Sequence, residues 1–284
     1  MVANRVARGL GFLWLATGAF ACGSSGGPEG SPDVAAGPAV GVAAITENGL
    51  TANGLSANGL SANGLSANGL SANGLSANGL SANGLSANGL TASGLLGNGS
   101  TALTDPATLQ LLQYIVSCAL DGQQILTFTA GGATYTFPGG LGLAPQWGLP
   151  HGSCDGSCQR WVSACVLARV DAAGVHREIS VRGPNLALLP TWSELAQYTQ
   201  REATYFGNLF IPGQPRYLCL SPGQTEDERA CGDSLSDCPM TVLGSCAKDC
   251  AFQGLFGDFD FCSDAGRFGT GQTYAESVTV YLPK

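Results

Sequence analysis

The sequence predicts a mixed α+β domain over residues 105–284, held together by disulfide bonds and preceded by a low-complexity five-residue repeat. Three observations lead to this fold class. Ten of the 11 cysteines lie in the C-terminal part of the chain. Helix-like and strand-like hydrophobic patterns follow each other within that part. An Asn-Gly-Leu unit recurs every five residues over the stretch before it.

The first 21 residues have the pattern of an export signal. Arg5 and Arg8 precede an apolar stretch, Gly9–Ala21, that contains no charge. This stretch is too short for a helix that spans a bilayer, which needs ~20 residues. We therefore expect residues 1–21 to be a signal peptide, and the mature chain to be exported without a transmembrane helix.

Cys22 is the expected lipid anchor. Ala19-Phe20-Ala21 fits ordinary signal peptidase cleavage, which would give a secreted protein. The same residues followed by Cys22 resemble a bacterial lipobox, in which the cysteine is lipidated. Lipidation would leave ten of the 11 cysteines, a number that can pair completely. If the lipoprotein resemblance holds, Gly23 implies sorting to the outer membrane, and residues 22–45, rich in Gly, Pro, Ser and Ala, form a tether behind the lipid.

The repeat occupies residues 46–104, including a decayed tail, and has two possible structures. Asn-Gly favours turns, and one leucine in five residues buries little apolar area, so a disordered spacer is the preferred interpretation. The alternative is a β-solenoid with one leucine of each unit in a shared core. The repeat resembles the pentapeptide-repeat family, whose square β-helix takes one side from each unit. The order Ala-Asn-Gly-Leu-Ser puts Asn at the position where that family has a small inward-facing residue.

Charge excludes one class of function. The net charge is −8, and residues 105–284 carry nearly all of it. An acidic surface without a basic patch repels phosphate backbones, so we expect no binding to nucleic acid. No cofactor motif is present, and we expect no cofactor.

Residues 105–284 contain signals for both helices and strands. Asp105-Pro106 is typical of a helix start, and Gly131-Gly132 between two apolar runs predicts a hairpin. Thr191 and Glu194 form a capping box that predicts a helix to about Thr204. The chain after Pro212 is expected to be rich in loops. Further expected elements are strands at 125–129, 133–137, 175–182 and 277–282, and helices at 106–119 and 156–170.

The ten remaining cysteines are expected to form structural disulfides, because this is the default in an exported chain. They are Cys118, Cys154, Cys158, Cys165, Cys219, Cys231, Cys238, Cys246, Cys250 and Cys262. Cys158 and Cys165 lie seven residues apart on one predicted helix, ~10.5 Å, so they cannot pair with each other. Their shared face predicts that two disulfides clamp this helix to other elements. Cys246 and Cys250 have a spacing found in zinc sites, but disulfides are the preferred interpretation.

Two short motifs resemble hydrolase sites. Gly232-Asp233-Ser234-Leu235 is similar to the first motif of GDSL-type hydrolases, but both histidines, His151 and His176, lie upstream of it. The segment from Cys154 to Cys158 is similar to the nucleophile motif of papain-like proteases, without a histidine far downstream. Ser234 and Cys158 are therefore the candidate nucleophiles of an alternative function, an exported hydrolase.

Carboxylates near residue 260 are a weak calcium candidate. Asp258, Asp260 and Asp264 lie in a glycine-bounded loop, but Cys262 occupies the place of an oxygen ligand. We expect a solvated loop and no metal site.

The whole layout resembles bacterial envelope lipoproteins that carry N-G-L repeats before a cysteine-rich domain. The resemblance rests on the anchor, on the repeat, and on stretches such as GLAPQW and CQRWVSACVLAR. It implies architecture and location, and no activity. The expected function is non-enzymatic: a membrane-anchored protein that displays a binding or structural domain to an extracellular or periplasmic ligand.

Overall fold

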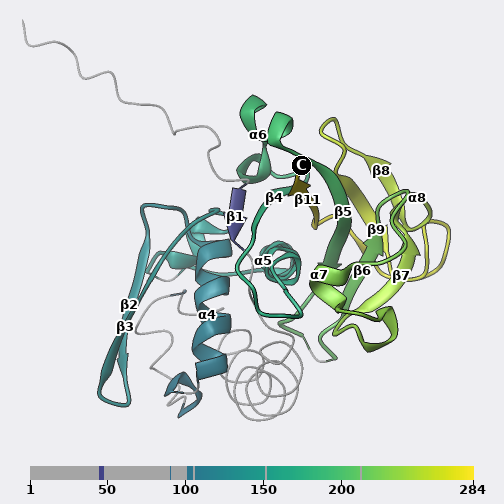
Figure 1. Ribbon diagram of the computed structural model, residues 1–284. Coiled ribbons are helices and arrows are strands. Elements are labelled where there is room, and N and C mark those ends of the chain that lie inside the picture. Colours follow the sequence, from purple (N-terminus) through teal and green to yellow (C-terminus); the bar gives the residue numbers. More distant parts are fainter. Residues whose placement is uncertain (1–44, 48–89, 91–100, 105, 151, 212) are drawn as a thin grey trace, which may run out of the picture. The chain divides into compact units, whose positions relative to one another are not determined.

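A six-stranded sheet forms the centre of the computed structural model, which describes residues 45–47, 90, 101–104, 106–150, 152–211 and 213–284. All these residues belong to one compact unit, which spans residues 39–284. Neighbouring strands are antiparallel except β6 and β7, which are parallel (Figure 1). In spatial order the strands are β1 (Ile45–Glu47), β4 (Glu178–Arg182), β11 (Ser277–Pro283), β5 (Tyr198–Gly207), β6 (Arg216–Leu220) and β7 (Thr241–Ser245).

Two helices and a hairpin lie beside this sheet. Helix α5 (Gly156–Ala168) packs against β5 and β11, and helix α4 (Pro106–Ala119) packs against α5. The hairpin of β2 (Ile125–Ala130) and β3 (Ala133–Pro138) packs on α4. Figure 1 shows α5 between α4 and the strands. The predicted α+β class is confirmed.

A three-stranded sheet packs near the other face of β11. It has the order β10-β9-β8, and β9 contacts β11. Its strands are β8 (Cys250–Gln253), β9 (Phe259–Ser263) and β10 (Thr273–Tyr274), and β8 follows α8 (Cys246–Asp249) directly. The remaining short helices are η1 (Thr101–Thr104), η2 (Pro145–Gly148), η3 (Leu186–Leu188), α6 (Trp192–Gln197), α7 (Glu228–Cys231) and η4 (Leu235–Asp237).

The hairpin at Gly131-Gly132 is confirmed. Both glycines have positive φ angles, 59° and 83°, as a two-residue type I′ turn requires. The strands pair in register from Ala130–Ala133 to Ile125–Pro138. The helices expected at 106–119 and 156–170 are also present, although α5 ends at Ala168.

The helix expected from Thr191 to about Thr204 is wrong in its second half. The capping box is present, with Glu194 N donating to Thr191 Oγ1, but α6 ends at Gln197. Tyr198–Gly207 forms β5, which pairs with β11 and β6. This segment is rich in Thr and aromatic residues, which suit a strand, and sheet pairing outweighs the helix-start signal.

The chain after Pro212 forms several strands, although it was expected to be rich in loops. Strands β6 to β11 all lie there. Of these, only β11 has a sequence signal, the alternation of Val278, Val280 and Leu282. The alternating pattern suggests one buried face, but residues Ser277–Tyr281 are all buried, because α5 covers one side of β11 and β9 contacts it as well. The strand expected at 175–182 begins only at Glu178.

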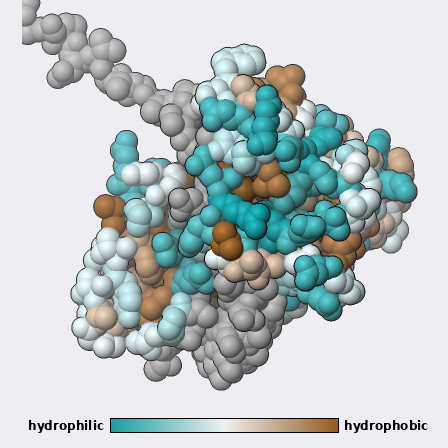
Figure 2. Space-filling view, viewed as in Figure 1, coloured by the Kyte–Doolittle hydropathy of each residue, from teal (hydrophilic) through white to brown (hydrophobic). Residues whose placement is uncertain are grey.

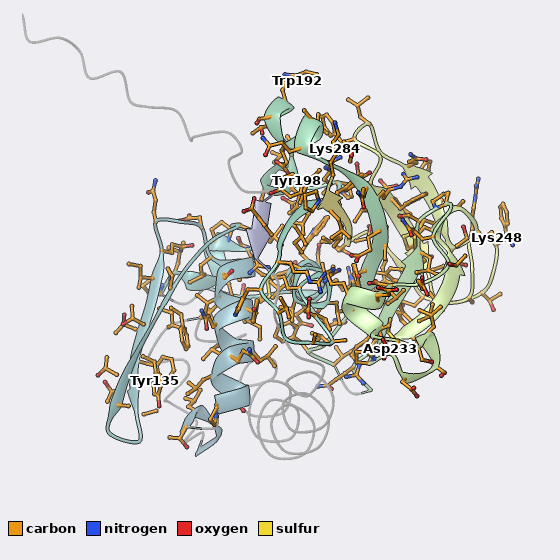
Figure 3. The ribbon with its side chains drawn as sticks, viewed as in Figure 1. Tyr135, Trp192, Tyr198, Asp233, Lys248 and Lys284 are labelled. Atoms are coloured by element: carbon orange, nitrogen blue, oxygen red, sulfur yellow. A yellow bond between two sulfur atoms is a disulfide. The ribbon has the colours of Figure 1, made fainter. Side chains whose placement is uncertain are left out.

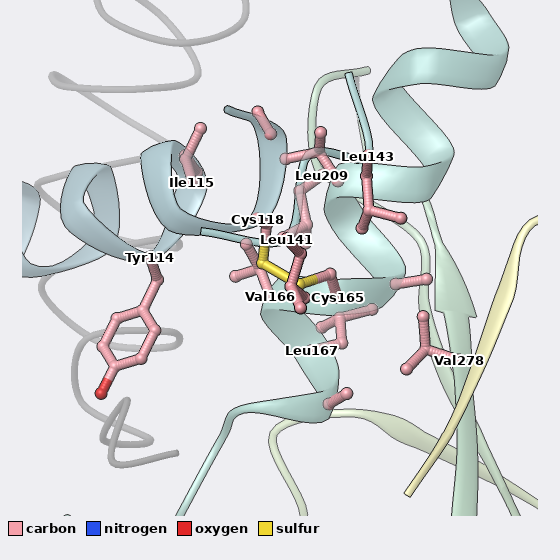
Figure 4. Close-up of a cluster of buried hydrophobic side chains, with 14 of the residues drawn as sticks. Tyr114, Ile115, Cys118, Leu141, Leu143, Cys165, Val166, Leu167, Leu209 and Val278 are labelled. Carbon is pink, nitrogen blue, oxygen red and sulfur yellow. A yellow bond between two sulfur atoms is a disulfide. The ribbon is translucent and has the colours of Figure 1, made fainter. Parts of the chain in front are cut away.

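The disulfide between Cys118 and Cys165 joins α4 to α5 inside the main core (Figure 4). Both cysteines are fully buried, and their Cα atoms are 6.0 Å apart. Leu141, Val166 and Leu167 surround the bond in Figure 4. A covalent link between two packed helices restricts the unfolded chain and so favours the folded state.

A buried ion pair ties α7 to β5 and to the end of α5. Arg229 Nη2 lies 2.6 Å from Glu202 Oε2 and 2.7 Å from the hydroxyl of Tyr205, and Arg229 Nη1 donates to the carbonyl of Ala168 at 3.0 Å. The Tyr205 hydroxyl in turn donates to Asp227. Because buried charges are tolerated only when their hydrogen bonds are satisfied, this network fixes the position of α7.

Both ends of the repeat contact the C-terminal domain. At the start of the repeat, Ile45–Glu47 pairs with β4 as the edge strand of the main sheet. Near its end, Leu90 is 1% exposed, belongs to the main core and donates its N–H to the carbonyl of Trp147 at 2.6 Å. Leu103, in η1, is buried in the same core. The core therefore includes side chains that precede Asp105.

Several predictions concern residues outside the described part of the chain. These are the signal peptide, Cys22, the tether and the repeat between residues 47 and 90. The choice between a spacer and a solenoid therefore stays a prediction. Within the described residues, no helix combines the length and the apolar character that crossing a bilayer requires.

Candidate functional site

A cleft of about 780 Å³ lies where α5, the main sheet and the three-stranded sheet meet. Its volume falls within the ~300–1,000 Å³ typical of small-molecule sites. Five segments supply its lining: α5, the β5–β6 loop, β6, residues 238–241 at and before the start of β7, and the β9–β10 region. The lining residues are Arg160, Asn208, Ile211, Gly213, Gln214, Pro215, Arg216, Tyr217, Cys238, Pro239, Met240, Thr241, Asp264, Gln272 and Tyr274.

Arg160 is held at the cleft by a two-point ion pair. Its Nε and Nη2 donate to the two carboxylate oxygens of Glu276, at 2.6 and 3.0 Å. Burial alone would raise the pKa of Glu276, but hydrogen bonds from Arg160 and Ser157 lower it below its ordinary value. The hydrogen bond to Glu276 likewise raises the pKa of Arg160. The pair is ionised at neutral pH and joins the first turns of α5 to the segment before β11.

Two tyrosines and an aspartate form another part of the lining. The Tyr217 hydroxyl donates to Asp264 Oδ2 at 3.2 Å, which ties β6 to the β9–β10 region. Burial, with the nearby Asp264 carboxylate, raises the pKa of Tyr217. Burial, Tyr217 and Asp264 raise the pKa of Tyr274 to about 12. Both phenols therefore stay protonated at neutral pH and can donate hydrogen bonds.

The β5–β6 loop shapes one rim of the cleft through unusual backbone angles. Gly207 has a φ of 144°, and a Cβ atom there would lie 2.1 Å from the carbonyl oxygen of Pro215. Gln214 is a non-glycine residue with a φ of 41°, and its N–H closes a turn onto Ile211. A left-handed residue with a side chain costs of order 1 kcal/mol and is frequent at ligand-binding loops. Asn208 fixes the loop from inside, since its Oδ1 accepts from Phe210 N at 2.9 Å.

The charges of the lining compensate each other. Arg160 faces Glu276, while Arg216 and Asp264 bring opposite charges into the same cleft. Burial lowers the pKa of Arg216, but a guanidinium remains protonated at neutral pH. The cleft therefore carries charged groups but little net charge.

Two disulfides pack against aromatic residues that line this cleft. Cys219–Cys246 links β6 to α8, and Cys250–Cys262 links β8 to β9. These cysteines pack with Phe206, Phe259 and Tyr274 in a second, smaller core. The rings of Phe206, Tyr217 and Tyr274 contact one another at centroid distances between 5.5 and 5.9 Å. Covalent links and packed rings therefore hold this part of the lining in place.

All ten expected cysteines are paired, so the predicted disulfide bonds are present. The remaining pairs are Cys231–Cys238, which holds the cleft rim to α7, and Cys154–Cys158. As expected, Cys158 and Cys165 do not pair with each other. The expectation that both clamp α5 to other elements is wrong for Cys158, whose partner lies only four residues earlier in the turn that leads into α5.

The clustered cysteines of the described residues are not available as metal ligands. Cys219, Cys246 and Cys250 place their sulfurs within 4.8 Å of one another, the single such cluster found there. Each sulfur is in a disulfide, and metal binding needs the thiolate. Of the calcium candidates, Asp264 accepts from Tyr217, and Asp258 is buried and held by main-chain amides of its own loop. The expected solvated loop is wrong, because Asp260 lies in β9 and its Oδ1 is buried without a hydrogen-bond partner among the described residues.

The two candidate nucleophiles lie in settings that do not activate them. Cys158 has no free thiol because it is bonded to Cys154, and its N–H is capped by Asp155 Oδ1 at 2.9 Å. The Ser234 hydroxyl shares a 2.7 Å hydrogen bond with Ser236 and accepts from Ser236 N–H at 3.2 Å. His176 is exposed, and His151 lies outside the described residues.

Sequence reasoning did not find the cleft. The sequence patterns indicated Asp264 only as a calcium candidate, and they indicated no role for Arg160, Arg216, Tyr217 or Tyr274. These residues come from separate segments between positions 160 and 274, and no spacing links them. The one related feature visible in the sequence is the set of cysteines, whose disulfides link some of the segments that line the cleft.

Family comparison identifies the repeat. Residues 45–71 and 69–99 match the GLTT repeat, with six copies. The Gly-Leu pair of that repeat is kept throughout, while the two following positions are mostly Ser-Ala. This agrees with the expected layout of a repeat before a cysteine-rich domain. Comparison with curated proteins and with solved structures found no match.

Proposed function

We propose that this protein is a non-enzymatic, lipid-anchored envelope protein whose disulfide-bonded domain binds a small polar ligand in the cleft. The cleft carries this proposal, because it has the size of a ligand site and polar groups from five segments converge in it. The five disulfides support an oxidising compartment, where such bonds persist.

The position of the repeat ends supports a specific arrangement of anchor and domain. Because Ile45–Glu47 and Leu90 both contact the domain, the repeat between them adds no length to the path from the membrane. That path consists of residues 23–44, which can extend at most about 80 Å at ~3.6 Å per residue. We propose that these residues act as the spacer between the anchor and the domain.

The anchor can be tested by metabolic labelling with palmitate in a bacterial host. The full-length chain is expected to incorporate label and to fractionate with membranes, whereas a Cys22→Ser variant loses both. Secretion of an unlabelled protein that begins at Cys22 would contradict the anchor.

The binding role can be tested by amide NMR of the mature protein against a mixture of small neutral, acidic and basic polar compounds. Shifts that cluster at cleft residues such as Thr241 and Gln272 are expected. Absence of any shift there would contradict the cleft as a site. Labelling of Ser234 by a fluorophosphonate would instead support the hydrolase alternative; its hydrogen bonds to Ser236 predict no labelling.

A further inference from the structure

The chemistry of the cleft lining narrows the class of ligand, an inference that rests on the proposed binding role. Only three lining residues carry formal charge: Arg160, Arg216 and Asp264. Arg160 is neutralised by Glu276, and the other two have opposite signs. A strongly charged ligand would find an almost equal number of attractive and repulsive groups. The cleft therefore favours a ligand without net charge.

Half of the twelve remaining lining residues carry neutral hydrogen-bonding side chains. They are two phenols, a hydroxyl and three carboxamides, from Tyr217, Tyr274, Thr241, Asn208, Gln214 and Gln272. Hydroxyls and carboxamides can each donate and accept. A surface of this kind suits a ligand whose own groups do both at short spacing, and it suits a purely apolar ligand poorly.

Hydrogen bonds within the protein hold some of these side chains in place, whereas others are exposed and can adapt to a ligand. Tyr217 is oriented by Asp264, and Asn208 by the β5–β6 loop and by Gln159 Oε1, at 3.3 Å. Thr241, which pairs with Tyr217, and Gln272 are exposed, and Gln272 Nε2 donates to the neighbouring carbonyl of Thr273. Tyr217 is half-buried and presents a ring with one apolar face and one polar end.

We propose that the cleft binds a neutral oligosaccharide. A pyranose ring presents adjacent hydroxyls, each a donor and an acceptor, and C–H groups that pack on a tyrosine ring. The hydroxyls bond to Asp264, Thr241 and the carboxamides, while the ring packs against Tyr217. Arg160 and Arg216 donate to hydroxyl oxygens, as a guanidinium has only donors. The cleft's volume admits a ligand larger than one sugar ring.

The test is an NMR titration of the mature protein with cellopentaose, maltopentaose and chitopentaose, and with pentagalacturonate as an acidic comparison. At least one neutral pentasaccharide is expected to shift the amides of Tyr217, Thr241 and Gln272. Its affinity is expected to exceed that of pentagalacturonate by ten-fold or more. Equal or tighter binding of the uronate would overturn neutral-ligand selectivity.

Variants at the exposed rim test whether binding occurs in the cleft. Thr241→Ala and Gln272→Ala each remove a hydrogen-bonding group from an exposed position, so folding is preserved. Each is expected to weaken binding about two- to ten-fold, the range for one neutral hydrogen bond. Gln253→Ala, an exposed change on β8 outside the cleft, is the matched control and leaves affinity unchanged. Identical affinity for all three variants would refute the cleft as the saccharide site.

The outcomes separate this inference from the proposed binding role. If the cleft amides shift with other polar compounds but with none of the neutral saccharides, the ligand class is wrong and the binding role stands. If no compound shifts them, both are wrong.

Discussion

Leu90 offers a direct test of the contact between the repeat and the C-terminal domain. Its side chain is 1% exposed and packs in the main core, where its N–H also bonds to the carbonyl of Trp147. Leu90→Ala removes the buried side chain and leaves a cavity, while the backbone hydrogen bond remains possible. Buried Leu→Ala changes typically cost ~2–5 kcal/mol. For a domain of this size that corresponds to a fall in Tm of roughly 4–20 °C.

Leu255→Ala is the matched control, because Leu255 is 92% exposed. The same substitution there is expected to change stability by less than ~0.5 kcal/mol. Both variants can be measured by urea unfolding of the mature protein, followed by circular dichroism and tryptophan fluorescence, with the disulfides intact. If Leu90→Ala costs no more than Leu255→Ala, Leu90 does not lie in the core and the repeat can act as a free spacer.

Two further predictions concern the disulfides and pH. The Cys118–Cys165 disulfide joins residues 47 positions apart, and replacing both cysteines by alanine is expected to lower the free energy of unfolding by about 4 kcal/mol in the chain-entropy model. The same change at Cys154 and Cys158, four positions apart, is expected to lower it by about 2 kcal/mol. Equal losses in urea unfolding would contradict the pairing of Cys118 with Cys165. The lowered pKa of Glu276 means that its pair with Arg160 stabilises the fold above the ordinary glutamate pKa of ~4.3 and that this contribution is lost as pH falls through the lower folded-state value. At pH 7 the Tm of the wild type is therefore expected to exceed that of Glu276→Gln, and the two Tm values are expected to converge as the pH falls to 3. A Tm difference that stays constant over this range would show that the carboxylate charge contributes nothing to stability.

Trp192 is a large apolar side chain that lies exposed on the surface without marking a binding site. Trp192 is 86% exposed and projects from α6 away from the rest of the domain (Figure 3). In the view of Figure 2 most of the surface around the strands is hydrophilic, with isolated hydrophobic residues. Single exposed apolar residues are common on soluble domains, so they do not define a second site.

Local signals predicted those elements whose structure depends on nearby residues. The Gly131-Gly132 turn and the capping box at Thr191 both follow from backbone requirements that few residue types meet. The end of α6 could not be predicted in this way. Residues 198–207 become a strand because β11, about 75 residues later, pairs with them. Non-local pairing of this kind leaves no periodicity in the strand itself when both of its faces are buried.

The sequence by itself determined the mixed α+β class, the even set of ten cysteines in the C-terminal domain and the five-residue repeat before them. These properties depend on composition and on short-range spacing. The tertiary structure decided which cysteines pair, brought Leu90 and Ile45–Glu47 onto the domain, and assembled a cleft from Arg160, Arg216, Tyr217, Asp264 and Tyr274. Sites of this kind depend on the packing of distant segments, and that packing is set by the core and the sheet order rather than by any one stretch of chain.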